Sequence, residues 1–266
     1  MSPTVPLTQV TFTGLPGIPH VQPGDDLAVL IYASLRRAGL TLETGDIVVI
    51  TSKLVSKAEG RFVNLNTVQP SARACRVAEI VRKDPRMVEL ILRESTAISR
   101  MRQDVLIVRH RLGFTLANAG IDHSNVGRES DDWVLLLPED PDRSARHIRQ
   151  RLAELTGVAP GVVISDSHGR PFRVGTVGVA IGLAGFPAVW DKRGQRDLYG
   201  RELRVTVTGL GDELAAAAGL ITGQGAEGLP VVLVRGLQVP AGEGCAADLI
   251  RPEALDLYAD HQETGG

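Results

Sequence analysis

Two aspartates stand where the sequence turns from apolar to polar, and their neighbourhoods offer ligands for a metal ion. Asp166 follows the apolar run 161–165 and precedes Ser167, and Asp122 lies in the glycine-bracketed stretch NAGIDHSNVG at 118–127. Adjacent carboxylate and hydroxyl oxygens suit a hard cation, and magnesium sites often combine one or two carboxylates with substrate phosphates. Asp, Ser and Asn are also standard turn residues, so turns that close a strand explain both stretches as well. The residue types alone leave the two interpretations open.

Three further stretches carry groups that can contact an anion. The stretch 49–61 sets hydroxyls and two lysines behind an apolar run, and such groups are good phosphate contacts. The stretches 14–19 and 222–229 are rich in glycine or proline, so their backbone amides can approach a ligand closely. The glycine and lysine spacing of a P-loop is absent from 49–61. A solvated loop and simple structural turns remain alternatives for these stretches.

The periodicity of apolar residues predicts the elements that must hold these stretches. Helical spacing predicts helices at about 25–39, 71–83, 85–95, 142–156 and 211–221. Asp25 and Asp142 suit the N-termini of two helices, and Gly39 and Gly157 suit their C-termini. β-branched apolar runs predict strands at 46–52, 104–109, 113–118, 133–138, 161–166, 176–182, 203–209 and 230–236.

The order of these elements predicts an α+β fold of mixed β-sheets with helices packed around them. Strands and helices alternate too irregularly for a doubly wound fold. The polar stretches fall where predicted strands end. By analogy with doubly wound sheets, we expect their side chains to meet at one edge of a sheet.

Composition excludes several classes of protein. The net charge is −2, with 29 basic and 31 acidic residues, so no overall field favours DNA, RNA or an anionic membrane. Aromatic residues make up 4% of the chain, which argues against a stacking platform for single-stranded nucleic acid. The chain shows neither a signal-peptide pattern nor the roughly 20-residue apolar run of a membrane helix. Cys75 and Cys245 are too few for a disulfide framework or a zinc site. We therefore expect a cytoplasmic protein.

Taken together, five segments resemble the coenzyme F420-0:L-glutamate ligase family, also called the coenzyme F420:γ-glutamyl ligase family. They occur in family order between about residues 14 and 236 and read GLPGIP, DIVVITSKLVSKAEGR, FTLANAGIDHSNVG, GVVISDSHGRPFRVGTVGVAIGLAG and GDELAAAAGLITGQGAEGLPVVLVRG. One such segment would be a weak match, whereas five in register are specific.

The resemblance implies GTP-dependent formation of an amide bond. The γ-phosphate of GTP activates the terminal carboxylate of coenzyme F420-0 as an acyl phosphate, the amine of L-glutamate attacks it, and GDP and phosphate are released. Further rounds add γ-linked glutamates. The resemblance also implies Mg²⁺ or Mn²⁺ at two divalent sites, K⁺ as a monovalent activator, and a homodimer.

Position by position, the resemblance assigns site residues to this chain. It places metal ligands at Asp122, Asp166, Ser167 and Gln224. It places GTP contacts at Leu15, Pro16, Gly17, Ile18, Thr51, Ser52, Lys57, Asn125, Thr222, Gly223, Gln224, Gly225, Ala226, Glu227, Gly228 and Leu229. This agrees with the residue types, because cations, amides and a lysine can together hold phosphates for in-line attack. No residue is assigned as a general base.

The chain departs from the family pattern at one of these segments. Where the family often has Asp-Thr-Phe-Gly-Arg, this chain has Asp-Ser-His-Gly-Arg at 166–170. Serine keeps the hydroxyl, while His168 replaces an aromatic residue and alters what packs over the site. We expect residues 1–255 to form one ligase module of two interleaved lobes, followed by a flexible tail at 256–266. The length leaves no room for the nitroreductase-like flavin domain that some bacterial relatives carry.

Two other functions would use the same groups. A metal-dependent nucleotide phosphohydrolase could use the oxygen ligands to position water instead of an acceptor. A non-enzymatic nucleotide- or deazaflavin-binding protein could use the same loops for binding alone. Formation of an amide product from GTP, L-glutamate and F420-0 distinguishes the ligase from both.

Overall fold

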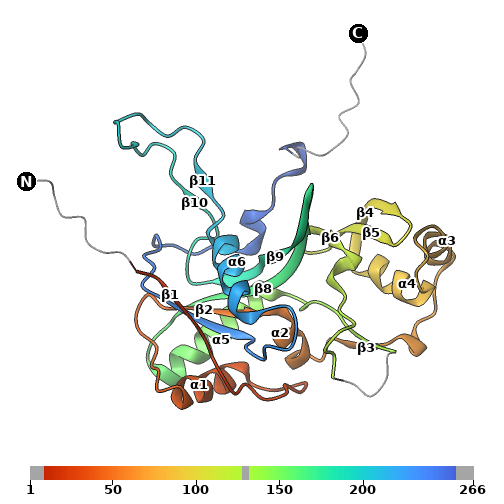
Figure 1. Cartoon of the computed structure of the whole chain (residues 1–266), viewed down its shortest axis with the longest axis horizontal. Helices are drawn as coiled ribbons and strands as arrows, with labels where there is room; N and C mark the ends of the chain where they lie inside the picture. The colour runs from red at the N-terminus through yellow and green to blue at the C-terminus, as the bar shows by residue number, and fades with distance from the viewer. Residues whose placement is uncertain (1–8, 128–131, 256–266) are drawn as a thin grey trace, which may run out of the picture.

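A five-stranded sheet lies at the centre of the computed structural model, which describes residues 9–127 and 132–255 (Figure 1). Its strands run in the order β1 (Thr11–Gly14), β12 (Val231–Arg235), β2 (Ile47–Thr51), β8 (Gly161–Arg170) and β9 (Arg173–Ala184). Neighbouring strands are antiparallel except β2 and β8, which pair in parallel. The predicted α+β fold with a mixed sheet is confirmed.

Helices cover both faces of this sheet. α1 (Leu27–Arg37) and α5 (Pro141–Thr156) share a core with Val48 and Ile50 of β2. α6 (Leu210–Thr222) packs on the other face, in a core that contains Ile47 and Val49. Because strand side chains alternate between faces, a strand covered on both sides is apolar at successive positions. This explains why four consecutive residues of β2 are buried.

A smaller group of elements packs beside the sheet around a core of its own. β4 (Ser95–Arg102), β5 (Val105–His110) and β6 (Thr115–Ala117) form an antiparallel sheet, and side chains of α3 (Ala72–Val81) and α4 (Pro85–Arg93) pack with it. β3 (Phe62–Asn64) pairs with β7 (Trp133–Leu135), and α2 (Ser52–Ala58) follows β2 directly. The short 3-10 helices are η1 (Leu65–Thr67), η2 (Asn118–Gly120), η3 (Ala246–Leu249) and η4 (Glu253–Leu255).

One predicted strand is mostly absent. Residues 203–209 were expected to form a strand, but only β11 (Val207–Thr208) does so, paired with β10 (Trp190–Asp191). The two short strands belong to an arm that extends away from the rest of the molecule (Figure 1). Val205 is 87% exposed there. The β-branched residues of this segment therefore have no helix or larger sheet to pack against in the described part of the chain, and most of the segment does not form a strand.

Two predicted boundaries also need correction. Asp26, rather than Asp25, caps α1, because its carboxylate accepts the amides of Ala28 and Val29. The helix expected to reach residue 95 ends at Arg93 and gives way to β4, whose mostly exposed side chains carry no apolar alternation. The predicted stop of α5 at Gly157 is confirmed by its left-handed φ of 76°.

Neither described range contains a helix that is long and apolar enough to cross a membrane. The tail predicted at 256–266 lies outside the described residues.

The contact between β9 and α6 generates a first testable prediction. A Cβ atom added to Gly178 of β9 would lie 2.1 Å from the Ala215 carbonyl oxygen of α6. Gly178→Ala must therefore push the helix away, and we expect it to lower the free energy of unfolding by about 1–3 kcal/mol. Urea denaturation measures this loss. Gly169→Ala is the matched control, because a Cβ there meets nothing within 4 Å. Equal stability of the two variants would contradict the observed packing.

Candidate active site

The first part of the site forms where β2 and β8 run side by side. In the parallel register Thr51 lies opposite Ser165, so the next residues, Ser52 and Asp166, are neighbours. Ser52 begins α2, and its Oγ donates to Asp166 Oδ1 over 2.8 Å. The strand was expected at 161–166, with Asp166 as its last residue. That end is wrong, because β8 continues to Arg170 as one arm of a hairpin with β9.

His168 packs behind Asp166. Two residues further along β8, its side chain points to the same face, and its Nε2 lies 3.1 Å from Asp166 Oδ2. His168 is buried, and its ring centroid lies 5.2 Å from that of Phe114. Asp166 is therefore held from two sides, by a hydroxyl of α2 and by a buried imidazole. The expectation that His168 affects packing at the site matches this position.

The second part of the site is the loop 118–127. Asp122 is anchored by two backbone hydrogen bonds to Leu135, and its Oδ1 accepts both the amide and the hydroxyl of Ser124. Its other oxygen, Oδ2, lies 2.7 Å from Lys53 Nζ. The Asp122 carboxylate is thus fixed in direction and compensated by a lysine. The stabilised turn considered from the sequence is present, and the carboxylate still borders the cavity described below.

Two lysines of α2 tie this loop to the sheet. Lys53 Nζ donates to the Ser124 carbonyl over 3.0 Å, and Lys57 Nζ donates to the Asn125 carbonyl over 2.8 Å. The sequence predicts no helix at 52–58 and leaves a solvated loop as an alternative there. These residues form α2 instead, in which Lys53 and Lys57 lie one turn apart. That spacing places both ammonium groups on one helical face.

The third part is the glycine-rich loop that follows α6. Gly223 adopts a φ of 65°, which ends the helix, and Asn125 Nδ2 donates to the Gly225 carbonyl over 3.3 Å. The Glu227 carboxylate accepts the Gly225 amide over 2.8 Å. Hydrogen bonds from the amide of Glu227 itself, then from Gly225 and Gln224, lower the pKa of Glu227. The loop amides therefore converge on a negative charge, which in this structure is the protein's own carboxylate.

The fourth stretch, residues 14–19, contributes less of its surface than expected. Leu15 is fully buried in the core, with its amide bonded to the Val231 carbonyl. The carbonyls of Pro16 and Gly17 accept hydrogen bonds from Ser34 and Arg37 of α1. Ile18 alone among the four predicted nucleotide contacts of this stretch lines the cavity.

These parts surround one cavity of about 730 Å³. It brings together all four predicted metal ligands and most of the predicted nucleotide contacts, which are Ile18, Thr51, Ser52, Lys57, Asn125, Thr222, Gly223, Gln224, Gly225, Ala226, Gly228 and Leu229. Leu15, Pro16, Gly17 and Glu227 are not among its lining residues. The expectation that the polar stretches meet at one edge of the sheet is met for four segments far apart in the sequence.

The cavity also has lining residues that the sequence interpretation missed. Gly178 of β9 and Gly219 of α6 form part of its wall. A glycine within a strand marks the close approach of another backbone or a ligand, so Gly178 did carry a signal. Lys53 is a possible anion contact in the sequence analysis, but its ion pair with Asp122 is not predicted there. The two residues are separated by 68 others, and no local pattern indicates such a pairing.

The oxygen atoms of the cavity fit a hard cation that keeps part of its water shell. Asp122, Asp166, Ser167 and Gln224 all line the cavity. Across residues 9–127 and 132–255, no group of three or more His, Cys, Asp and Glu side chains gathers as a metal cage. Two carboxylates with neutral oxygens suit magnesium or manganese ions that share phosphate oxygens of a substrate. The same set does not suit zinc, which prefers nitrogen and sulfur ligands.

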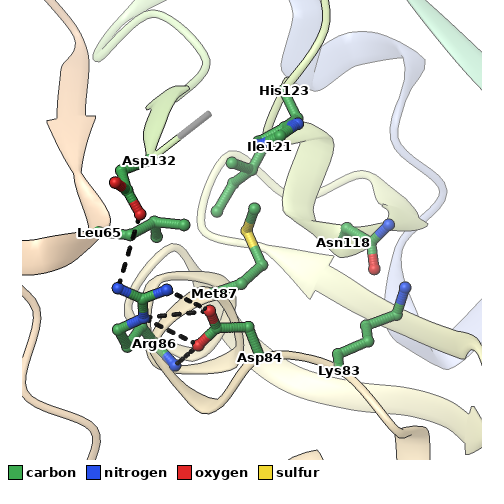
Figure 2. Close-up of a pocket in the computed structure, with 9 residues that line it drawn as sticks. All are labelled: Leu65, Lys83, Asp84, Arg86, Met87, Asn118, Ile121, His123 and Asp132. Carbon is green, nitrogen blue, oxygen red and sulfur yellow. Dashed lines mark hydrogen bonds and ion pairs between the residues drawn. The ribbon is translucent and has the colours of Figure 1, made fainter. Parts of the chain in front are cut away.

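The neighbours of Asp122 point to opposite sides of their loop. Asp122, Ser124 and Asn125 line the 730 Å³ cavity, whereas His123 lines a separate cavity of about 520 Å³. Ile121 borders both cavities. The loop is thus a shared wall, and Figure 2 shows the second cavity with His123 and Ile121 on one side of it.

The chain is an α+β protein with a candidate site at the edge of a mixed sheet. The sequence profile of the F420-0:Gamma-glutamyl ligase family matches residues 17–236. The coenzyme F420:L-glutamate ligase of Methanothermobacter thermautotrophicus is 47% identical over 94% of this chain and 98% of its own length. Those of Methanopyrus kandleri and Archaeoglobus fulgidus are 50% and 45% identical, over 90% and 91% of this chain and 93% of each relative. The chain therefore belongs to the F420-0:gamma-glutamyl ligase family and is a ligase.

Two serines of α2 provide a matched test of the bond between α2 and β8. Ser52 and Ser56 are both buried, but only Ser52 Oγ bonds to a carboxylate, and Ser56 Oγ has no partner among the described residues. Ser52→Ala should lower the free energy of unfolding by about 1.5–3 kcal/mol, because hydrogen bonds to charged groups contribute that much. Ser56→Ala should be neutral or stabilising. Guanidinium denaturation measures both, and equal losses would contradict the assigned bond.

Proposed function

We propose that this ligase joins L-glutamate to the terminal carboxylate of coenzyme F420-0 in a GTP-dependent reaction. The observation that carries the proposal is the single cavity in which acidic, hydroxyl, amide and lysine groups from four segments meet. The name that the relatives share, coenzyme F420:L-glutamate ligase, supports the choice of acceptor and amino acid. The resemblance of the segments around the cavity supports GTP as the nucleotide.

The proposed chemistry proceeds in two displacements. An oxygen of the acceptor carboxylate attacks the γ-phosphorus of GTP, the bond to the β-phosphate oxygen breaks, and GDP leaves. The free amine of L-glutamate then attacks the carbonyl carbon of the acyl phosphate, loses one proton, and expels inorganic phosphate. The new product ends in a glutamyl carboxylate, so further rounds can add γ-linked glutamates by the same steps.

The chain's own groups supply orientation and charge for these displacements. Lys57 and the amides of the 222–229 loop hold the phosphates, because ammonium groups and clustered amides bind phosphate well. Asp122, Asp166, Ser167 and Gln224 would hold one or two Mg²⁺ or Mn²⁺ ions, with K⁺ as a monovalent activator. When bound, such ions neutralise the charge that separates the two anionic reactants. Ser52 and His168 keep the Asp166 carboxylate directed at the cavity.

A homodimer is part of the same proposal. The arm between β10 and β11 exposes Leu198, Tyr199 and Val205, and such clustered apolar side chains mark interaction surfaces. Figure 1 shows this arm extending away from the rest of the chain. Two free cysteines support a reducing compartment such as the cytoplasm.

Incubation of the protein with GTP, Mn²⁺, L-glutamate and F420-0 tests the proposed reaction. Mass spectrometry should detect a product heavier by one or more glutamyl units, and GDP release should depend on L-glutamate. GDP release without amide product would support a nucleotide phosphohydrolase instead. Nucleotide binding without turnover would overturn the proposal.

Asp166→Asn tests the role of the carboxylate without changing its shape. We expect kcat to fall at least about 100-fold, since one group that stabilises charge in the transition state contributes on that order. Glu154→Ala is the control, because Glu154 lies exposed on α5 in an ion pair with Arg151, and such pairs contribute little. Thermal unfolding shows whether each variant is folded. Full activity of a folded Asp166→Asn enzyme would remove Asp166 from the proposed machinery.

A further inference from the structure

The second cavity, of about 520 Å³, has the features of a binding site, and none of the proposed metal or GTP contacts lines it. It lies between α4 and the 118–127 loop, and Leu65, Met87 and Ile121 form its apolar surface (Figure 2). Because Ile121 borders both cavities, a ligand held here lies next to the site of the proposed bond formation. Pockets of a few hundred Å³ with an apolar lining and a few polar groups are typical for small organic ligands.

Arg86 contributes a flat guanidinium group to this cavity, held by several hydrogen bonds. Its Nε lies 3.1 and 3.0 Å from the two Asp84 oxygens, its Nη2 lies 2.7 Å from Asp84 Oδ2, and its Nη1 donates to Asn66 over 2.7 Å. Asp132 adds a second carboxylate 3.8 Å from Nη1. The side-chain hydrogen bond from Arg86 lowers the pKa of Asp84, so this pair stays charged and closed. A guanidinium neutralised in this way offers its plane for stacking on an aromatic ring rather than a charge for an anion.

Lys83 and Asn118 supply the groups with unused bonding capacity. Lys83 Nζ makes no ion pair or hydrogen bond with the described residues, so its ammonium group can contact a ligand. The charged side chains of the lining, Lys83 and Arg86 with Asp84 and Asp132, sum to zero. The Oδ1 atom of Asn118 is buried without a hydrogen-bond partner in the same part of the chain. Figure 2 shows both on one side of the cavity. An unpaired buried acceptor costs stability, which a ligand N–H would recover.

The backbone at this wall is strained as well. Asn118 and Ala119 both have a φ of 52°, and left-handed conformations of non-glycine residues are uncommon and costly. Such strain persists where the surrounding structure requires a particular geometry. Here it places the Asn118 amide at the edge of the cavity.

We propose that this cavity binds the acceptor substrate through a flat heteroaromatic ring, with Lys83 facing an anionic group of the acceptor and Asn118 Oδ1 accepting a ring N–H. The inference rests on the proposed function, in which the acceptor is F420-0, a deazaflavin with a phosphodiester and a terminal carboxylate. The ring lies against Met87 and the Arg86 plane, and the arm that bears the carboxylate has to pass the Ile121 side chain, which borders both cavities, to reach the first one. L-Glutamate fits this cavity poorly, because it has two carboxylates and no flat apolar surface for the lining to cover.

Direct titration of F420-0, followed by the fluorescence of its deazaflavin ring, tests this placement without turnover. Lys83→Glu reverses the free charge, and Asn118→Gly removes the amide while suiting the left-handed backbone. Each should raise the Kd for F420-0 about tenfold or more, as expected for the loss of a hydrogen bond or ion contact in a ligand site. GTP affinity should stay within about twofold of the parent protein. Arg76→Ala, which removes an exposed cation of α3 outside the cavity, is the matched control and should change neither affinity.

The steady-state assay separates failure of this inference from failure of the proposed function. If the parent protein forms the glutamyl product, the two variants should raise KM for F420-0 and keep kcat and KM for GTP. Product formation with unchanged KM and Kd for F420-0 in both folded variants would overturn the placement and leave the proposed reaction intact. A parent protein that neither binds F420-0 nor forms product would overturn both.

Discussion

The parallel pairing of β2 with β8 is the constraint on which the rest of the site depends. It sets Ser52 against Asp166, and it starts α2 at the edge where both strands face the cavity. α2 then carries Lys53 and Lys57 to the 118–127 loop, and Asn125 of that loop contacts the glycine-rich loop after α6. A one-residue slip of the register would turn every side chain of β8 to the opposite face. The burial of β2 and β8 on both faces makes such a slip costly.

Much of the candidate site could be predicted because its signals are local. A β-branched run followed by Asp, Ser or Lys identifies a strand that ends at a polar edge, and parallel neighbours present such ends together. The segments around Ser52 and Asp166 followed this logic, since they belong to the parallel pair β2 and β8. Gln224 follows a helix and Asp122 follows a strand of another sheet, yet all four residues line one cavity. The mixed sheet followed from the irregular order of strands and helices. Family resemblance added the assignment of individual roles, which residue types had left open.

The remaining details depend on contacts that no local pattern encodes. Asp166 lies within a strand because β9 pairs along the whole of β8, although the polar sequence there resembles a turn. Leu15 is buried because β12 lies against its backbone, and the glycine and proline around it gave no sign of this burial. Glu227 bends back onto its own loop amides, which its sequence position did not indicate. Asp25 and Asp26 are adjacent residues of the same type, so the backbone geometry alone decides that Asp26 caps the helix.

The order of the central sheet also bears on how the chain folds. β12, the last strand in the described part of the sequence, lies between β1 and β2, which are among the first. Arg235, the last residue of β12, donates a hydrogen bond to Asp46, 189 residues away. Until residue 231 has left the ribosome, β1 has no partner and β2 has one free edge. Such non-local pairing slows folding and leaves unpaired strand edges open to other chains. The nascent chain therefore depends on protection of these edges until almost all of it has been synthesised.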